Sequence, residues 1–207
     1  LTIDETIQSI CEKYMQKGVE DNNVLNKGVC IAMDVNTGAI LAMVTTDGYD
    51  LNNPYELSAK DKKKIKSTAK SKQAEAESAA LSNMWRNKAV ADTYMPGSVF
   101  KMCVASAALE ENLVNEKTSF TCTGSILVEG ETIHCSNIAG HGTQNFVEVI
   151  SNSCNPAFIQ IGQMLGAGKF RQYYQGFGFS DKTGIDLPGE AEDSFWKEGK
   201  MGGVDLA

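Results

Sequence analysis

Two short motifs constrain the fold of this chain more than any other feature. The first is Ser-Val-Phe-Lys at residues 98–101, and the second is Ser-Cys-Asn at residues 153–155, whose serine follows Ser98 by 55 positions (153 − 98). A serine followed three residues later by a lysine can act as a nucleophile with its own base. A second serine with an asparagine two residues on can relay a proton and bind an amide. The chain is therefore expected to bring both segments to one cleft.

The segment around Ser98 is predicted to begin a helix. A Pro-Gly turn at residues 96–97 precedes it, and residues 100–112 are rich in Ala, Leu, Met and Glu, which favour helix. Positions three apart share one helix face, so Lys101 can contact Ser98 within a turn. Lysine acts as a base only where burial or a neighbouring cation lowers its pKa, and the apolar residues beside Lys101 favour burial. The alternative is an ordinary capped helix with a solvated lysine.

The second motif is predicted to lie between two helices. Apolar residues form one face before it, at residues 146–150, and another after it, at residues 158–165. Pro156 suits the first turn of the second helix. Ser153 and Asn155 are then on a short loop, free to point into one cleft as a proton relay and an amide ligand. The alternative is a polar turn, because Ser and Asn are common in turns.

With these motifs in place, the chain resembles a known family over nearly all its length. It looks like the first part of the transpeptidase domain of class B penicillin-binding proteins, the division and sporulation type. The matching segments, in family order, are residues 1–4, 34–38 with 40–43, 86–89, 92–98, 141–143, 153–158 and 183–190. The resemblance implies an α/β (α+β) fold of the penicillin-binding-protein and serine β-lactamase type. In that fold an antiparallel sheet is flanked by helices and joined to an all-helical subdomain.

The resemblance also implies residue roles and an activity, that of a peptidoglycan D,D-transpeptidase. Ser98 would be the acylated nucleophile, Lys101 its general base, Ser153 a proton relay and Asn155 a ligand of the substrate amide. The substrates would be peptidoglycan stem peptides, and β-lactams would be covalent inhibitors. No cofactor is implied. The parent protein would work with a cell-wall glycosyltransferase at the extracytoplasmic face of the bacterial membrane, held by an N-terminal anchor.

A Lys-Thr-Gly at residues 182–184 spells the third motif of this family, but we expect it to be accidental. It lies only 29 positions after Ser153 (182 − 153) and is surrounded by turn residues, whereas the family motif lies on a strand. The family motif would follow downstream of Ala207. Residues 1–207 are therefore expected to be the N-terminal portion of a transpeptidase domain, truncated before the strand that supplies the oxyanion-hole amide.

Three alternative functions remain open at this point. A β-lactamase shares the first two motifs but hydrolyses its acyl-enzyme, and no segment here resembles the Glu-bearing loop of class A enzymes. A penicillin sensor of the same fold would be acylated without turnover. A fragment that lacks the far wall of the cleft would be non-catalytic.

Composition limits the partners of the chain. A net charge of −7 argues against nucleic acid, which requires a basic face. No apolar run approaches the roughly 18 residues of a membrane span. At 207 residues, the chain is long enough to bury a sizeable core.

Outside the motifs, three segments have clear patterns. Thr-Ile-Asp-Glu at residues 2–5 is a capping-box pattern that predicts the start of an amphipathic helix, which Gly18 can end. Residues 28–35 and 39–45, joined at Asn-Thr-Gly, predict an antiparallel hairpin. Residues 56–82 are polar and lysine-rich, and are expected to form a solvated insert or linker without chemistry.

The six cysteines form no regular disulfide pattern. Three of them lie in apolar patterns and are expected to be buried as small hydrophobic side chains: Cys11, Cys30 and Cys103. Cys154 lies inside the second motif. It is expected to pack in the core and not to act as a nucleophile, because the sequence around it offers no base.

Cys122 and Cys135 flank a predicted hairpin at residues 124–133 and could be bridged in an oxidising compartment. Zinc is a further alternative, bound by Cys122, His134, Cys135 and His141. However, the spacing matches no zinc finger, and the adjacent His134 and Cys135 would face opposite sides of a strand. We therefore favour free thiols over a disulfide and a disulfide over zinc, and assign no metal ligand.

Overall fold

The computed structural model describes residues 2–24, 27–46, 48–192 and 201–202. Its backbone contacts divide the chain into two compact units. The first comprises Leu1–Asp92 with Leu187–Ala191, and the second comprises Thr93–Asp186 with Glu192–Ala207. Within the described ranges, no helix combines the length and the apolar character needed to cross a membrane.

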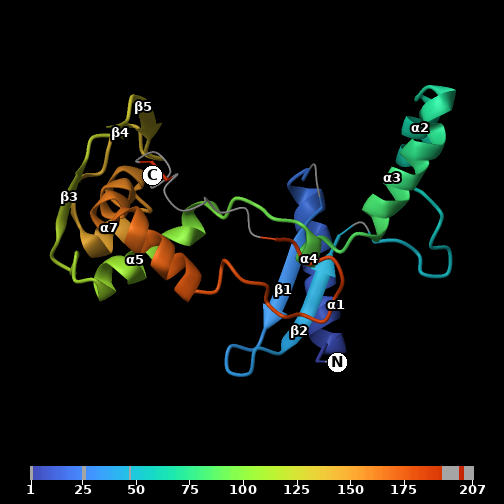
Figure 1. Ribbon diagram of the computed structural model, residues 1–207, viewed down its shortest axis with the longest axis horizontal. Helices are drawn as coiled ribbons and strands as arrows, with labels where there is room; N and C mark the ends of the chain where they lie inside the picture. The colour runs from blue at the N-terminus through green and yellow to red at the C-terminus, as the bar shows by residue number, and fades with distance from the viewer. Residues whose placement is uncertain (1, 25–26, 47, 193–200, 203–207) are drawn as a thin grey trace. The chain divides into compact units, whose positions relative to one another are not determined.

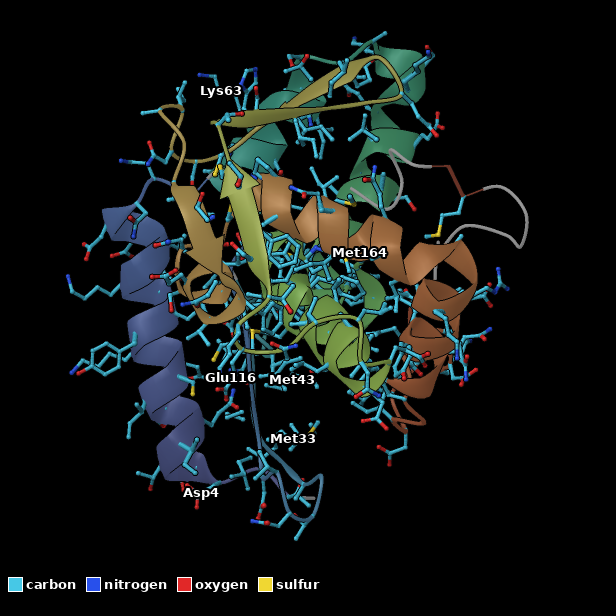
Figure 2. All side chains as sticks on the ribbon, turned by 90° about the vertical axis from the view of Figure 1, so that its left-hand side faces the viewer. Asp4, Met33, Met43, Lys63, Glu116 and Met164 are labelled. Carbon is cyan, nitrogen blue, oxygen red and sulfur yellow. The ribbon has the colours of Figure 1, made fainter. Side chains whose placement is uncertain are left out.

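The first unit begins with α1 (Glu5–Asp21) (Figure 1). Its N-cap is Asp4, labelled in Figure 2, whose side chain accepts a hydrogen bond from the Ile7 amide. The predicted capping box at Thr2 is therefore wrong, because the Thr2 hydroxyl instead donates to the carbonyl of Ile40. The predicted end at Gly18 is also wrong: Gly18 stays helical and the helix continues to Asp21.

The predicted hairpin is confirmed. Strands β1 (Val29–Met33) and β2 (Ile40–Thr45) pair antiparallel, and Gly38 closes the turn with a φ of +74°. Helix α1 packs against β2, and Gln8 joins the two elements. The Gln8 side chain accepts from the Met43 amide at 2.8 Å and donates to the Met43 carbonyl at 3.1 Å. It thus pairs both backbone hydrogen-bonding groups of Met43, as a neighbouring strand would.

The polar segment of the first unit is helical. It contains α2 (Ala59–Lys66), the short η1 (Lys70–Lys72) and α3 (Gln73–Trp85), none of which has a buried residue. The two α-helices pack against each other, and the last unit-1 helix is the short α4 (Lys88–Ala91). Exposed helices agree with the solvated character expected of this lysine-rich stretch.

The second unit holds both motifs. Its elements are η2 (Gly97–Phe100), α5 (Lys101–Glu110), β3 (Ser119–Cys122), β4 (Ser125–Val128), β5 (Glu131–His134), β6 (Gly142–Asn145), α6 (Phe146–Ser151) and α7 (Asn155–Gly176). Strand β3 pairs with β6 and β4 with β5, both antiparallel, and the hairpin predicted at 124–133 is thus confirmed. Over the whole described chain the strands form three separate two-stranded sheets.

The core of the second unit forms where α5 packs against α7. The buried cluster combines small residues of α5 with larger side chains of α6 and α7, among them Ala108, Val149, Phe158 and Ile161. Burying side chains of this size contributes about 1.5–3 kcal/mol each for the larger ones, before entropy is counted. This packing fixes the beginning of α5 beside the beginning of α7, which is where the two motifs lie.

Gly140 and Gly130 offer a matched test of the packing beneath the motifs. Both have φ in the left-handed region, +83° and +94°, so alanine at either costs about 1–2 kcal/mol in backbone strain. A Cβ at Gly140 would also lie 2.4 Å from the carbonyl oxygen of Cys122, whereas at Gly130 it meets nothing within 4 Å. We expect Gly140→Ala to lower the free energy of unfolding by roughly 3 kcal/mol or more, and Gly130→Ala by the strain alone. Urea denaturation measures both, and equal losses would contradict the close packing.

Candidate active site

The side chain of Lys101 connects the two motifs. Its Nζ donates to the carbonyl of Ser153 at 2.8 Å, to the Ser153 hydroxyl at 3.0 Å and to Asn155 Oδ1 at 2.6 Å. The same nitrogen lies 5.3 Å from the centre of the Phe158 ring, a distance at which a cation is attracted to the ring face. The two segments predicted to share one site are therefore in direct contact through Lys101.

Ser98 lies on η2, one turn before the first residue of α5. The helix start is thus as predicted, although its first turn is a 3₁₀ turn. The side chain of Ser98 is exposed, and within the described part of the chain no hydrogen bond involves its hydroxyl. Apolar side chains on either side of it are also exposed, including Met95 and Val99. The hydroxyl is consequently open to a ligand, while the Lys101 amine points to the second motif.

Ser153 adopts an unusual backbone conformation. Its φ is +48°, in the left-handed region that non-glycine residues rarely occupy. The residue lies in the short turn between α6 and α7, as predicted, and the turn is closed by a hydrogen bond from its amide to the carbonyl of Ile150. This conformation directs both the carbonyl and the hydroxyl of Ser153 toward Lys101.

Both polar atoms of the Asn155 side-chain amide form hydrogen bonds within the site. Its Oδ1 accepts from Lys101, and its Nδ2 donates to the carbonyl of His134 at the end of β5. It is the first residue of α7, with Pro156 in the first turn as predicted. The bond to His134 was not anticipated from the sequence, because His134 lies 21 positions away.

Opposing influences act on the charge of Lys101. Burial lowers the pKa of Lys101, and the nearby thiols Cys135 and Cys154 oppose that shift only in part. Three acceptors around one amine match the three donors of the charged form. After proton loss, the Ser153 hydroxyl can reverse its role and donate to the neutral amine.

Lys182 of the accidental Lys-Thr-Gly lies in a segment without strand structure. It is exposed and within 3.9 Å of Glu192. The expectation that residues 182–184 do not form a strand-borne motif agrees with this structure.

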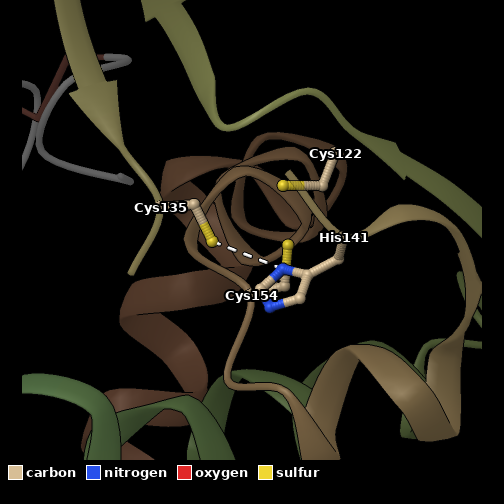
Figure 3. Close-up of side chains that lie close together, drawn as sticks. All are labelled: Cys122, Cys135, His141 and Cys154. Atoms are coloured by element: carbon tan, nitrogen blue, oxygen red, sulfur yellow. Dashed lines mark hydrogen bonds between the residues drawn. The ribbon is translucent and has the colours of Figure 1, made fainter. Parts of the chain in front are cut away.

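A second group of side chains lies next to the Ser-Cys-Asn turn (Figure 3). Cys122, Cys135, His141 and Cys154 place their potential ligand atoms within 4.8 Å of one another. The group keeps three residues of the zinc alternative but replaces His134, which is exposed, by Cys154. None of the six cysteines forms a disulfide in the structure.

The thiols of this group differ in their acidity. Burial raises the pKa of Cys135, but hydrogen bonds from the backbone N–H groups of Asn137 and Asn155, together with the side chains of Cys122 and Ser136, bring that pKa below its ordinary value. Burial also raises the pKa of Cys154, to about 11. The predicted packing role of Cys154 agrees with its complete burial.

The other three cysteines differ slightly from expectation. Cys11, Cys30 and Cys103 were expected to be buried, but each is only half-buried. They lie on α1, β1 and α5, where part of each side chain remains in contact with solvent.

A mixed fold that sets a Ser-x-x-Lys turn against a Ser-x-Asn turn is the arrangement of the penicillin-recognising serine proteins. The family model of the penicillin binding protein transpeptidase domain matches residues 28–204, and the chain belongs to this family. The resemblance noted in the sequence is thereby confirmed.

Curated relatives agree with this family. The chain is 34% identical to stage V sporulation protein D of Bacillus subtilis, over 100% of this chain and 29% of that protein. It is 31% identical to peptidoglycan D,D-transpeptidase PbpA of Mycobacterium tuberculosis, over 86% of this chain and 35% of that protein. The chain therefore spans 29–35% of the length of these two relatives.

Solved structures confirm the predicted fold class. The crystal structure of PBPA from Mycobacterium tuberculosis has a TM-score of 0.66 at 30% identity, covering 86% of this chain and 40% of that one. The TP domain of Burkholderia pseudomallei penicillin-binding protein 3 has a TM-score of 0.75 at 22% identity, covering 100% of this chain and 50% of that one. The second likeness concerns the fold alone.

The lowered pKa of Lys101 is directly measurable. In a protein labelled with ¹³C at the lysine Cε, we expect Lys101 to titrate below the ordinary lysine value of about 10.4. Because burial disfavours the charged form, Lys101 loses its proton at a lower pH in the folded state than in the unfolded state. Stability against unfolding then rises with pH between the folded and the unfolded pKa. The Lys101→Met variant assigns the resonance, and a midpoint at or above the ordinary value would contradict burial as the dominant cause.

Proposed function

We propose that the protein to which this chain belongs is a peptidoglycan D,D-transpeptidase that acylates on Ser98. The observation that carries the proposal is the Lys101 amine, three residues after an exposed serine and hydrogen-bonded to both Ser153 and Asn155. Burial lowers the pKa of this lysine, as a base requires. The curated relative PbpA carries the name of the same activity.

In the first step, the Ser98 hydroxyl attacks a carbonyl carbon of a peptidoglycan stem peptide. The Oγ–C bond forms, the peptide C–N bond breaks, and the Ser98 proton passes to Lys101. The Ser153 hydroxyl, 3.0 Å from the amine, relays a proton to the departing amine. The product is an ester of Ser98 and a free terminal residue.

In the second step, the amine of a neighbouring stem peptide attacks the ester. A new amide bond forms, the Ser98–C bond breaks, and the proton of the attacking amine returns to Ser98 through Lys101. A β-lactam enters the first step only, because opening its ring leaves the departing amine attached and blocks the second amine.

Asn155 is proposed to act in two ways. Its amide oxygen holds Lys101, so it positions the base. Its Nδ2 is bonded to the carbonyl of His134 and would have to exchange this partner for a substrate carbonyl to serve as the predicted ligand. Both roles depend on the same amide orientation.

The chain is proposed to be the first part of a transpeptidase domain, with residues 56–82 as a polar insert and the third motif downstream of Ala207. The parent protein is proposed to be anchored at the extracytoplasmic face of the bacterial membrane. There it would meet its stem peptides and a cell-wall glycosyltransferase.

Loss of the nucleophile tests the proposal in the full-length protein. Ser98→Ala is expected to abolish covalent labelling by a fluorescent penicillin, read by intact-mass spectrometry. Ser106→Ala is the matched control, because Ser106 is an exposed serine of α5 whose hydroxyl bonds the Met102 carbonyl. Labelling that persists in Ser98→Ala contradicts the assignment. A wild-type adduct that disappears within minutes would indicate a β-lactamase instead.

Loss of the base should slow acylation without preventing the fold. Lys101→Met is expected to reduce the acylation rate by about 10²–10⁴-fold, the usual contribution of general-base catalysis. Lys182→Met is the control, because it removes the lysine of the accidental motif. Equal rates in the two variants would remove Lys101 from the mechanism.

A further inference from the structure

The cluster of Cys122, Cys135, His141 and Cys154 forms where two strands end and another strand and a helix begin (Figure 3). Cys122 ends β3, Cys135 directly follows β5, His141 directly precedes β6, and Cys154 is the N-cap of α7. Three of these residues are buried and His141 is half-buried. Side chains that are 13, 6 and 13 positions apart (135 − 122, 141 − 135, 154 − 141) thus meet at one point.

The size of the cluster matches a tetrahedral zinc ion. With Zn–S of about 2.3 Å and Zn–N of about 2.0–2.1 Å, tetrahedral ligands lie roughly 3.6–3.8 Å from one another. The Cys135 sulfur lies 3.5 Å from His141 Nδ1, and all four atoms lie within 4.8 Å. Shifts of a fraction of an ångström therefore close the cluster around an ion. Three thiols and one imidazole are a ligand set of structural zinc sites.

A disulfide accounts for the cluster less well. One bridge uses two sulfurs, so a third buried thiol and the imidazole would remain without a role. The surroundings of Cys135 also favour a metal over a disulfide. The backbone N–H groups of Asn137 and Asn155 interact with its sulfur. N–H donors at a sulfur stabilise a thiolate, which is the form that binds a metal.

Gln144 adds an independent observation. It is only 3% exposed, and its side-chain oxygen accepts from Asn152, but its Nε2 has no hydrogen-bond partner that meets normal geometry. The Gln144 side chain nevertheless lies close enough to the Cys154 sulfur to interact with it. A buried donor without a partner is costly, and a metal-bound thiolate at Cys154 would supply its acceptor.

We propose that Cys122, Cys135, His141 and Cys154 bind one zinc ion that holds the Ser-Cys-Asn turn in place. Binding replaces the three thiol protons, which are released to solvent, and leaves a centre with a net charge of −1. Because Cys154 lies between Ser153 and Asn155, the ion fixes the two residues that hold Lys101. This proposal places zinc ahead of the free thiols and the disulfide that the sequence favoured.

Metal content tests the site directly in the full-length protein. After purification with added zinc and removal of loosely bound metal, we expect one zinc per chain by elemental mass spectrometry. Cys135→Ser and Cys154→Ser should lose most of it, while Cys103→Ser, a half-buried cysteine outside the cluster, should keep it. The Ser98→Ala variant should also keep the zinc, so failure of this inference is separable from failure of the proposed catalysis.

Cobalt substitution covers the case in which the cysteine variants fail to fold. Wild-type protein titrated with Co²⁺ should saturate at one equivalent and show the charge-transfer absorption of a tetrahedral cobalt–thiolate centre. Absence of bound metal together with six thiols that remain free in the native protein would overturn the inference. A mass lowered by two hydrogens, assigned to a bridge within the cluster, would overturn it equally.

The positioning role has its own readout and rests on the proposed function. Removal of zinc by a chelator is expected to slow penicillin labelling of Ser98 by at least about tenfold, as loss of supporting contacts commonly does. Restoring zinc should restore the rate. Labelling that is unaffected by demonstrated zinc loss would refute the positioning role and leave the metal site intact.

Discussion

The contact of the Lys101 amine with the turn that carries Ser153 and Asn155 is the interaction on which the site depends. It joins the start of α5 to the start of α7, and the apolar packing between these helices keeps the joint in place. A half-buried amine needs partners, because burying an unpaired charge is costly. The turn supplies three oxygen acceptors, and the Phe158 ring covers one side. The same burial that requires these partners favours the neutral form that can act as a base.

Much of this arrangement could be predicted from local sequence. The two motifs, the hairpins, the Pro156 helix start and the lack of strand structure at residues 182–184 all depend on neighbours within a few positions. Apart from the meeting of the two motifs, contacts between distant residues could not be predicted. Two examples are the hydrogen bond of Asn155 to the His134 carbonyl and the inclusion of Cys154 in the cluster. Both arise at the termini of separate elements, and hydrophobic periodicity does not indicate which termini lie together. At α1, the predicted cap Thr2 instead bonds the Ile40 carbonyl, a tertiary contact that the local pattern does not record, and Asp4 caps the helix.

The second motif serves two neighbouring networks at once. Ser153 and Asn155 face Lys101, while Cys154 between them faces the core and the cluster. This alternation follows from a tight turn at the start of a helix, which sends successive side chains to opposite sides. Only one peptide unit therefore separates the packing of Cys154 from each of the two residues that hold Lys101. The middle residue of the motif, for which the proposed catalysis has no role, is constrained by its complete burial.

The left-handed conformation of Ser153 has an evolutionary consequence. Glycine would adopt this backbone without strain and would stabilise the fold by about 1 kcal/mol, yet it would remove the hydroxyl beside Lys101. Asparagine tolerates the conformation better than serine but offers a larger and differently shaped group. Selection for stability and selection for the proposed proton relay would thus act in opposite directions at this position. A drift toward glycine here would mark relatives that keep the fold and have given up the chemistry.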